Sequence, residues 1–270
     1  MLQFSTYKRP LVEGLILFKH QTAMWKPASP YNNLPELPPP FRETAKIFRQ
    51  TTQSRVALER LHQTVRLLPE KEIFVQIIPV LEAQASSEIE NIAAATDNLF
   101  KYLDADSQAD DAAKEVLRYR QALWKGMDSL KRCPLSLRTM TAVSSTLRGS
   151  KVSVRKLNGT CIASASSGQV IYTPPAGEAL ILEKLHNLVE FLHSPSEMDP
   201  LVKMAIAHYQ FEAIHPFSDG NGRTGRILNI LYLAESGLLS QPVLYLSRYI
   251  IRHKLKYYAA LLNVTKEGAW

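Results

Sequence analysis

Between two segments with the apolar spacing of helices lies the sequence HPFSDGNGRTGR, residues 215–226. The segment before it ends near Ile214, and the segment after it begins its apolar run at Ile227. Three glycines so close together would destabilise the interior of a helix, because glycine loses more backbone freedom there than any other residue. The sequence therefore predicts two helices joined by a glycine-rich turn that opens the second one.

The chemistry of this stretch is that of a phosphate site. A glycine-rich turn at the start of a helix presents free N–H groups at the positive end of the helix dipole, where anions bind. Arg223 and Arg226 lie three residues apart on one helix face and can bind phosphate oxygens. Asp219 can hold a magnesium ion that bridges phosphates, and His215 has a pKa suited to a general base.

Each of these residues alone has a common structural explanation. A single His215 is most often a structural histidine, and a single Asp219 is an ordinary N-cap of the following helix. Helix capping does not require a base, a carboxylate, a Gly-Asn-Gly turn and two arginines within twelve residues. Their joint occurrence favours a functional site.

Outward from this stretch, the apolar spacing is mostly helical. After further helical stretches between residues 45 and 92, helices are predicted at 109–131, 135–148, 178–194, 199–213, 220–236 and 245–266. Asp199 and Pro200 mark the start of one helix, and Gly237 follows the last apolar turn of another. We expect a mainly α protein.

Residues 151–173 (KVSVRKLNGTCIASASSGQVIYT) break the helical period. They contain β-branched residues, an Asn158-Gly159 turn, and Ser166-Ser167-Gly168 between two short strand-like runs. The pattern predicts a β-hairpin on an otherwise helical protein.

Composition indicates a folded protein. The 270 residues include 32 Lys and Arg against 25 Asp and Glu, a formal net charge of +7, and 46% are hydrophobic. This is not the composition of a disordered chain. The basic excess lies at the two ends without the aromatic interleaving that would argue for nucleic acid, so nucleic acid is not an expected partner.

The cysteines and the longest apolar run bear on the compartment. Cys133 and Cys161 are the only cysteines and have no C-x-x-C spacing, which excludes a disulfide scaffold and a cysteine-based zinc site. The apolar run 11–18 near the start is too short for a membrane span and has no cleavage site. We expect a cytoplasmic protein with no membrane partner.

The chain divides into three regions in this interpretation. Residues 1–40 form a tail and a strap, and the strap 27–40 (PASPYNNLPELPPP) is extended because its prolines disfavour a helix. Residues 41–108 form an N-terminal helical region. Residues 109–270 form the domain that carries the HPFSDGNGRTGR stretch.

Residues 215–226 match, at every defined position, the signature H-x-F-x-D/E-G-N-G-R-x-x-R, and the chain therefore resembles the Fic-domain protein adenylyltransferases of the Fic/Doc family. The similarity runs from about Met24 to Trp270 and includes PVLEAQAS at 79–86. It is closest to the bacterial type with an N-terminal inhibitory helix. The resemblance implies a Fic-type helical domain with a β-hairpin flap and an N-terminal helical extension.

The resemblance implies transfer of AMP from ATP to a Ser, Thr or Tyr hydroxyl of a protein, with release of pyrophosphate. His215 would take the hydroxyl proton, Asp219 would bind Mg²⁺, and Phe217 would anchor the loop in the core. The amides of residues 220–222 and the Asn221 side chain would hold the α- and β-phosphates, and the two arginines would take the β- and γ-phosphates. The implied ATP-binding residues are Gly220, Asn221, Gly222, Arg223, Thr224, Gly225 and Arg226.

A second motif precedes this site in the chain. Ser86 and Glu90 occupy the defined positions of the family's inhibitory motif S/T-x-x-x-E-G/N, and they share a helix face as i and i+4. Taken alone, this spacing is common on solvated helix faces. Together with the signature it implies that Glu90 pairs with Arg226, occupies the γ-phosphate site and inhibits the enzyme within the chain.

The resemblance also suggests partners. The hairpin at 160–173 would align a protein substrate by strand addition, and the chain itself would be a second substrate, with a homodimer as its assembly. A structural edge hairpin is the alternative. Tyr257 and Tyr258 would line the adenine pocket, although two adjacent side chains of a helix cannot both face one pocket.

Other functions compete with adenylylation. A Doc-like kinase binds the nucleotide in reverse and typically has lysine at the position of Gly222, so glycine favours nucleotidyl transfer. Transfer of another nucleoside monophosphate remains open, because the signature contacts phosphates and not the base. A non-catalytic regulatory module is a third alternative, and the intact His215 counts against it.

The chain differs from the family at both ends. Residues 1–23 match no family segment and can come from an upstream start codon. Relatives commonly continue beyond the position of Trp270 into more helices and often a winged-helix module. We therefore expect the packing of the last helix to be affected.

Overall fold

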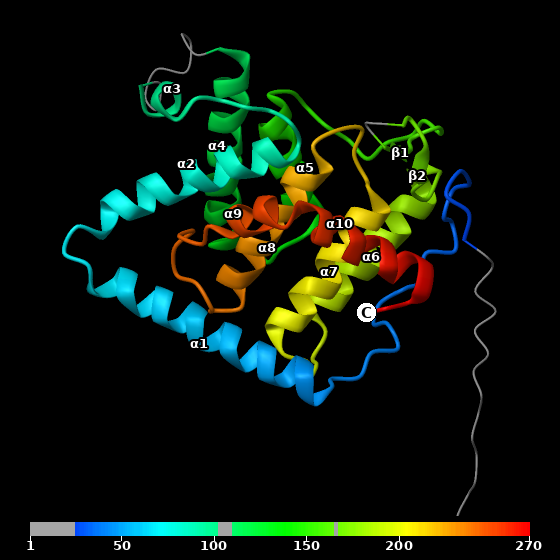
Figure 1. Ribbon diagram of the computed structural model, residues 1–270, viewed down its shortest axis with the longest axis horizontal. Coiled ribbons are helices and arrows are strands. Elements are labelled where there is room, and N and C mark those ends of the chain that lie inside the picture. The colour runs from blue at the N-terminus through cyan, green and yellow to red at the C-terminus, as the bar shows by residue number, and fades with distance from the viewer. Residues whose placement is uncertain (1–24, 102–109, 165–166) are drawn as a thin grey trace, which may run out of the picture.

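Helices make up most of this protein, as the computed structural model in Figure 1 shows for residues 25–101, 110–164 and 167–270. The expected mainly α fold is confirmed. The expectations for residues 1–23 and for the Ser166 part of the hairpin turn lie outside the described residues. The helices are α1 (Ala45–Leu67), α2 (Lys71–Ile89), α3 (Thr96–Lys101), α4 (Asp111–Leu130), α5 (Leu137–Arg148), α6 (Glu178–His193), α7 (Pro200–Ile214), α8 (Asn221–Glu235), α9 (Leu246–Arg252) and α10 (Lys254–Glu267).

Local sequence determines several helix ends. The Asp199 side chain accepts a hydrogen bond from the N–H of Leu201, and Pro200 follows as the first residue of α7, as its sequence predicts. Gly237, just beyond α8, has a left-handed backbone with φ of +71°. These ends are set by the turn chemistry of single residues.

The single helix predicted at 245–266 is wrong, because the structure divides it into α9 and α10 at His253. The backbone of His253 leaves helical geometry, with φ of −123° and ψ of 29°. Its N–H still bonds to the carbonyls of Tyr249 and Ile250, and its ring stacks on Tyr249 at 4.1 Å between centroids. These contacts end α9, and the chain changes direction before Lys254.

The predicted hairpin is present and short. Strands β1 (Ile162–Ala163) and β2 (Val170–Tyr172) pair antiparallel, with Ile162 opposite Tyr172. The Gly168 N–H donates to the Ser164 carbonyl at 2.8 Å and closes the described part of the turn. The hairpin projects at the edge of the molecule beyond α7 (Figure 1).

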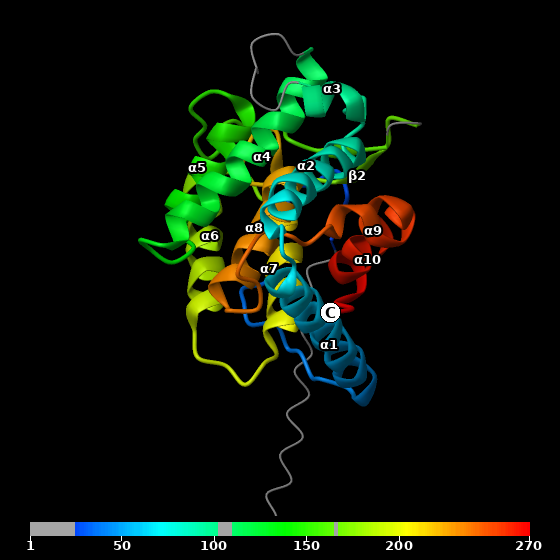
Figure 2. The ribbon, with the colours of Figure 1, turned by 90° about the vertical axis from the view of Figure 1, so that its left-hand side faces the viewer.

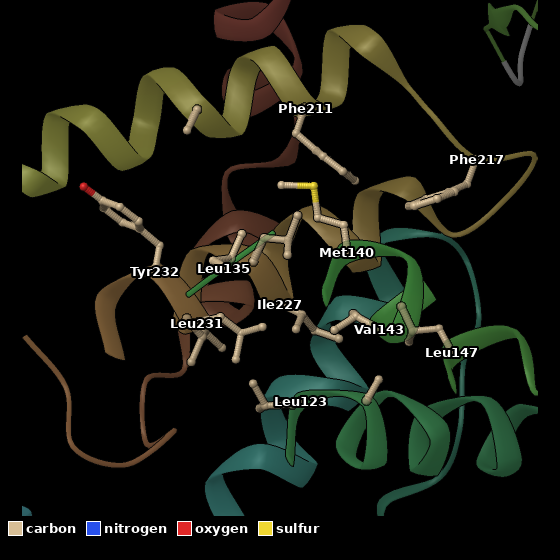
Figure 3. Packing of buried hydrophobic residues seen from close by; sticks show 14 of the residues in the cluster. Leu123, Leu135, Met140, Val143, Leu147, Phe211, Phe217, Ile227, Leu231 and Tyr232 are labelled. Carbon is tan, nitrogen blue, oxygen red and sulfur yellow. The ribbon is translucent and has the colours of Figure 1, made fainter. Parts of the chain in front are cut away.

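The core lies around α7 and α8. Nearly every side chain of α8 is buried, including Ile227 and Leu231, which pack toward α4 and α5 (Figure 3). In contrast, α1 lies at the periphery in both Figure 1 and Figure 2. The start of α8 is therefore held by packing on several sides.

The proline-rich strap 27–40 has no helix, as predicted, and it packs against α6 and the end of the hairpin. Tyr31 donates its backbone N–H to the Thr173 carbonyl at 3.0 Å, and the Lys184 ammonium donates to the Leu34 carbonyl at 2.7 Å. Leu34 and Leu37 are buried. The strap is thus part of the folded body.

Among the described helices, none is both long enough and apolar enough to cross a membrane.

Candidate functional site

Helix α7 delivers His215 to the site. The His215 backbone is left-handed, with φ of 49° and ψ of 59°, and its N–H donates to the Phe211 carbonyl at 3.0 Å. The ring atom Nδ1 is buried, and burial lowers the pKa of His215 to about 4. The imidazole is therefore neutral at pH 7 and able to accept a proton.

The loop after His215 is anchored in the core. The Phe217 ring is fully buried and lies 6.3 Å from the Phe211 ring between centroids (Figure 3). The Asn221 side chain accepts from the Phe217 N–H and donates to the Phe217 carbonyl, both at 2.8 Å. Both polar atoms of Asn221 are thus engaged in closing the loop, whereas its place in the signature predicts a side chain that contacts the phosphates.

The first turn of α8 has no side-chain cap from the described residues. Its N-cap Gly220 has a left-handed backbone with φ of 76°. The Gly220 N–H itself bonds to Asp219 Oδ1 at 2.7 Å. The next N–H groups of the helix therefore remain available to an anion.

Arg226 is the largest fully buried side chain of the described residues, at 1% exposure. Its Nε donates to Ser86 Oγ at 2.7 Å, and its Nη2 donates to the Ser86 carbonyl at 2.9 Å and to Glu90 Oε1 at 2.8 Å. Burial is the largest single influence and lowers the pKa of Arg226, but the Glu90 carboxylate together with Tyr257, Glu212 and Tyr119 outweighs it, so that the pKa is raised. The guanidinium is thus held as a cation between α8 and α2.

The other arginine of the signature, Arg223, pairs with a carboxylate that was not expected from the sequence. Its Nη1 lies 2.6 Å from Glu115 Oε2 of α4, and the arginine side chain is 3% exposed. The adjacent Thr224 is fully buried. Both signature arginines are therefore paired in this structure.

Helix α2 presents three polar residues along one ridge, because Glu82, Ser86 and Glu90 are spaced four apart. Glu82 is fully buried and accepts hydrogen bonds from the Ser247 N–H at 2.8 Å and the Ser247 hydroxyl at 2.5 Å. Tyr119 donates to the same carboxylate at 3.3 Å. Sequence reasoning missed Glu82, although its place in the same i, i+4 series as Ser86 and Glu90 was a usable signal.

Two glycines permit the close approach of helices at the site. A Cβ at Gly222 would collide with Glu90 Oε1, and one at Gly225 would collide with Glu212 Oε1 of α7. Burial raises the pKa of Glu212 to about 7. The glycines of the signature thus make room for carboxylates of α2 and α7.

Asp219 is an exposed acidic residue at the rim of the site. Its Oδ2 pairs with Arg148 of α5 while Oδ1 accepts from Gly220. No group of three or more His, Cys, Asp and Glu in the described residues is arranged to hold a metal ion. A single carboxylate beside an anion-binding helix start fits Mg²⁺, which binds through one or two carboxylates together with substrate phosphates.

The two tyrosines of α10 have different environments. The Tyr257 hydroxyl lies 2.7 Å from His208 Nε2 of α7, and burial raises the Tyr257 pKa well above its ordinary value. Tyr258 is 43% exposed, with its ring 5.2 Å from that of Tyr257. The two side chains thus differ in exposure and in polar partners although their rings are in contact.

An uncapped helix start, a histidine that burial keeps neutral and two buried arginines thus lie together in a mainly helical protein. Two family models match the chain, Fic/DOC family N-terminal over residues 48–128 and Fic/DOC family over residues 135–233. Together they cover about two thirds of its length. The chain belongs to the Fic/DOC family, and the resemblance noted in the sequence is confirmed.

Curated relatives carry adenylyltransferase names. The protein adenylyltransferase fic-1 of Caenorhabditis briggsae is 41% identical over 92 residues, which are 33% of this chain and 17% of that protein. A probable protein adenylyltransferase of Aquifex aeolicus is 37% identical over 98 residues, or 36% of this chain and 28% of that protein. The matched segments thus span less than a third of these relatives.

Solved structures show the same fold. A Fic family protein from Desulfovibrio desulfuricans aligns with a TM-score of 0.65 and 20% identity, covering 84% of this chain and 69% of that one. Fic-1 from C. elegans aligns with a TM-score of 0.55 and 20% identity, covering 83% of this chain and 66% of that one. The Fic-type helical fold expected from the signature is confirmed.

Proposed function

We propose that this protein is a protein adenylyltransferase that transfers AMP from ATP to a Ser, Thr or Tyr hydroxyl. The observation that carries the proposal is the neutral His215 beside the uncapped start of α8, where Arg226 supplies a buried positive charge. The names of the relatives support the same activity. We also propose that the chain divides near residues 40 and 108 into the N-terminal tail and strap, the N-terminal helical region and the Fic domain.

His215 acts as the general base. Its neutral imidazole takes the proton of the target hydroxyl as that oxygen attacks the α-phosphorus of ATP. A bond forms between the hydroxyl oxygen and phosphorus, the bond to the bridging β-phosphate oxygen breaks, and pyrophosphate leaves. Because Nδ1 is buried, Nε2 is the ring atom that faces the hydroxyl.

The start of α8 binds the phosphates. Backbone N–H groups of Asn221 and Gly222 hold the α- and β-phosphates, and Arg223 and Arg226 neutralise the β- and γ-phosphates. Bound Mg²⁺ at Asp219 would neutralise charge on the phosphates. In this structure Asp219 pairs with Arg148, so Arg148 must release it when the metal binds. Tyr257 and Tyr258 border the adenine side of the site, with Tyr258 the more exposed of the two.

Glu90 inhibits the enzyme in our proposal. Its carboxylate takes the Arg226 Nη2 donor that the γ-phosphate needs, at 2.8 Å, and Ser86 holds the rest of the guanidinium. Glu90 also lies close against Gly222 of the phosphate-binding turn. A triphosphate cannot occupy this position while the carboxylate is there, because like charges would meet without water between them.

The protein substrate docks on the hairpin 160–173. Ile162 and Ile171 are exposed at 37% and 38%, and a two-stranded sheet leaves edge groups open to strand addition. The chain itself is a second substrate in this proposal, presented by another copy in a homodimer. The reaction is placed in the reducing cytosol, where the exposed free thiols of Cys133 and Cys161 persist.

The geometry around Gly222 favours nucleotidyl transfer over the kinase alternative. A lysine at this position, as in Doc-like kinases, would collide with Glu90 in the present arrangement. The same phosphate contacts allow another nucleoside triphosphate as donor, because none of them involves the base.

Labelled ATP distinguishes these activities. Full-length protein with Glu90→Gly, incubated with Mg²⁺ and either α-labelled or γ-labelled ATP, should incorporate the α-label into protein and not the γ-label. Glu88→Gly is the matched control, because Glu88 is an exposed residue of the same helix end. Incorporation of the γ-label would establish a kinase, and no incorporation of either label by Glu90→Gly would refute the proposed activity.

A further inference from the structure

The C-terminal end of α7 is bound by residues from outside the helix. The last carbonyls of a helix have no partner within it and must be satisfied from elsewhere. Here Arg155, which precedes β1, donates from Nε to the His215 carbonyl at 2.8 Å and from Nη2 to the Ile214 carbonyl at 3.2 Å. The same Nη2 also bonds to the Pro175 carbonyl just after the hairpin.

Further backbone and side-chain hydrogen bonds from the hairpin region stabilise the same end of α7. The Arg155 N–H donates to the Pro216 carbonyl at 2.9 Å, so residue 155 contacts the chain on both sides of the His215 peptide. From β2, the Tyr172 hydroxyl donates to the Ala213 carbonyl at 2.8 Å. The hairpin and the segment before it therefore hold the carbonyls of residues 213–216 in sequence.

These hydrogen bonds act on a backbone conformation that is unfavourable by itself. His215 is a non-glycine residue in the left-handed region, a conformation that costs free energy unless the surroundings impose it. Arg155 is 7% exposed, so its rigid fork of donors is held within the protein and not by water. A short or flexible side chain could not reach three carbonyls at once.

The charge of Arg155 also acts on the imidazole. Burial is the main cause of the low His215 pKa, and interaction with the Glu212 backbone opposes it. The Arg155 guanidinium lowers the pKa further, while Glu90 from α2 and Asp219 from the loop raise it. Arg155 thus opposes two carboxylates that would keep a proton on the base.

We infer that Arg155 is the positioning residue for the base: it fixes His215 in its left-handed conformation and ties it to the hairpin on which the target docks. This inference rests on the proposed function and extends it. The base and the docking strand then move as one unit, so that a hydroxyl aligned on the hairpin lies in register with the imidazole.

The test compares Arg155→Gln and Arg155→Lys in the full chain with Glu90→Gly. Glutamine removes the charge and two of the three carbonyl contacts, whereas lysine keeps the charge with a single donor group. We expect Arg155→Gln to lower the rate of α-label transfer at saturating ATP by about tenfold or more, with ATP affinity changed less than about twofold. Arg155→Lys should restore part of the rate. Lys156→Gln is the matched control, because Lys156 is exposed and forms only a surface ion pair with Glu178.

A readout independent of activity is the NMR titration of His215, assigned by its loss in His215→Ala. Arg155→Gln should move the His215 resonance and raise its pKa from about 4 toward the ordinary value, and Lys156→Gln should not. An unchanged resonance and rate in Arg155→Gln would overturn the inference, as would a parallel loss of ATP binding and rate. If Arg155→Gln does not fold, Arg155→Lys decides by the rate: because lysine lacks the fork of donors, its rate should still fall below that of the parent with ATP affinity little changed, and an unchanged rate would overturn the inference. A changed resonance with no label transfer in any variant would refute the proposed function alone.

Discussion

Helices α2 and α7 end in the same way and deliver opposing groups to one site. Asn91 after α2 and His215 after α7 are the two non-glycine residues with positive φ in the described residues, at 64° and 49°. The end of α2 presents Glu90, and the end of α7 presents His215 itself. In each case a basic side chain from a distant segment binds the terminal carbonyls.

The two ends differ in how firmly they are held. At α7, Arg155 and Tyr172 bind several carbonyls, and Nδ1 of the ring is buried. At α2, Asn91 and Ile92 donate to the carbonyls of Glu88 and Ser87, and Lys254 donates to the Ile89 carbonyl at 2.6 Å. The Glu90 side chain keeps 35% exposure. His215 is therefore the more firmly held of the two groups, and the inhibition that we propose for Glu90 can end by movement of its partly exposed side chain alone.

The largest expected effect comes from removing the base. His215→Ala should lower α-label transfer at least about 100-fold, because general-base catalysis typically contributes 10²–10⁴ in rate. ATP binding should persist, because the phosphate contacts come from α8. Transfer rates and calorimetric ATP titration check this, with the exposed His186→Ala as control. Equal transfer by His215→Ala and the parent would remove His215 from the mechanism.

Removing the Glu90 carboxylate at the end of α2 should have the next largest effect on the transfer rate. Glu90→Gly frees Arg226 for the triphosphate and should raise transfer about tenfold, the equivalent of about 1.4 kcal/mol. Stability should fall by about 1 kcal/mol, at the low end for a buried charge that loses a partner, because Ser86 still binds the guanidinium. Denaturant unfolding and label incorporation measure the two quantities. Identical labelling in Glu90→Gly, Glu88→Gly and the parent would refute inhibition by Glu90.

We expect a smaller increase in the transfer rate from a change that weakens the C-terminal end of α2 without altering Glu90 itself. Lys254→Met removes the bond to the Ile89 carbonyl, a contribution of about 1 kcal/mol, and should raise transfer up to about fivefold. Combined with Glu90→Gly it should add nothing further, because both changes release the same carboxylate. Lys256→Met on the exposed face of α10 serves as control. A further increase in the double variant would show that Lys254 acts elsewhere.

The last prediction concerns the pH dependence of stability that comes from the α7 end. Because burial lowers the His215 pKa to about 4, the unfolded chain binds a proton near pH 6.5 that the folded chain does not. This contribution therefore reduces stability as pH falls from about 6.5 to about 4. Denaturant unfolding at several pH values should show a shallower loss in His215→Ala than in the parent. Parallel curves would mean that the imidazole is not held neutral by the fold.

Sequence alone predicted what is local. The twelve residues at 215–226 contain the loop anchor Phe217, the uncapped helix start and both arginines, because one turn and one helix bring them together. The Asp199-Pro200 helix start and the hairpin are equally local. The break at His253 was missed because the apolar spacing continues through it, while contacts with Tyr249 end the helix.

What the sequence could not show are partners far apart in the chain. Arg155, Glu115 and Lys254 look like ordinary charged residues of solvated segments, yet each binds the site or its supports across many residues. Asn221 was expected on phosphates from its place in the signature. Only the folded loop shows that its side chain closes on the Phe217 backbone.

The contact between Gly222 and Glu90 couples the two positions when this site changes by mutation. A Cβ at position 222 has no room while the Glu90 carboxylate is in its present position. A side chain at 222 therefore requires the Glu90 carboxylate to swing away from Arg226, which its flexible and partly exposed side chain allows. A substitution at 222 would thus disturb the Glu90–Arg226 ion pair although it alters neither partner.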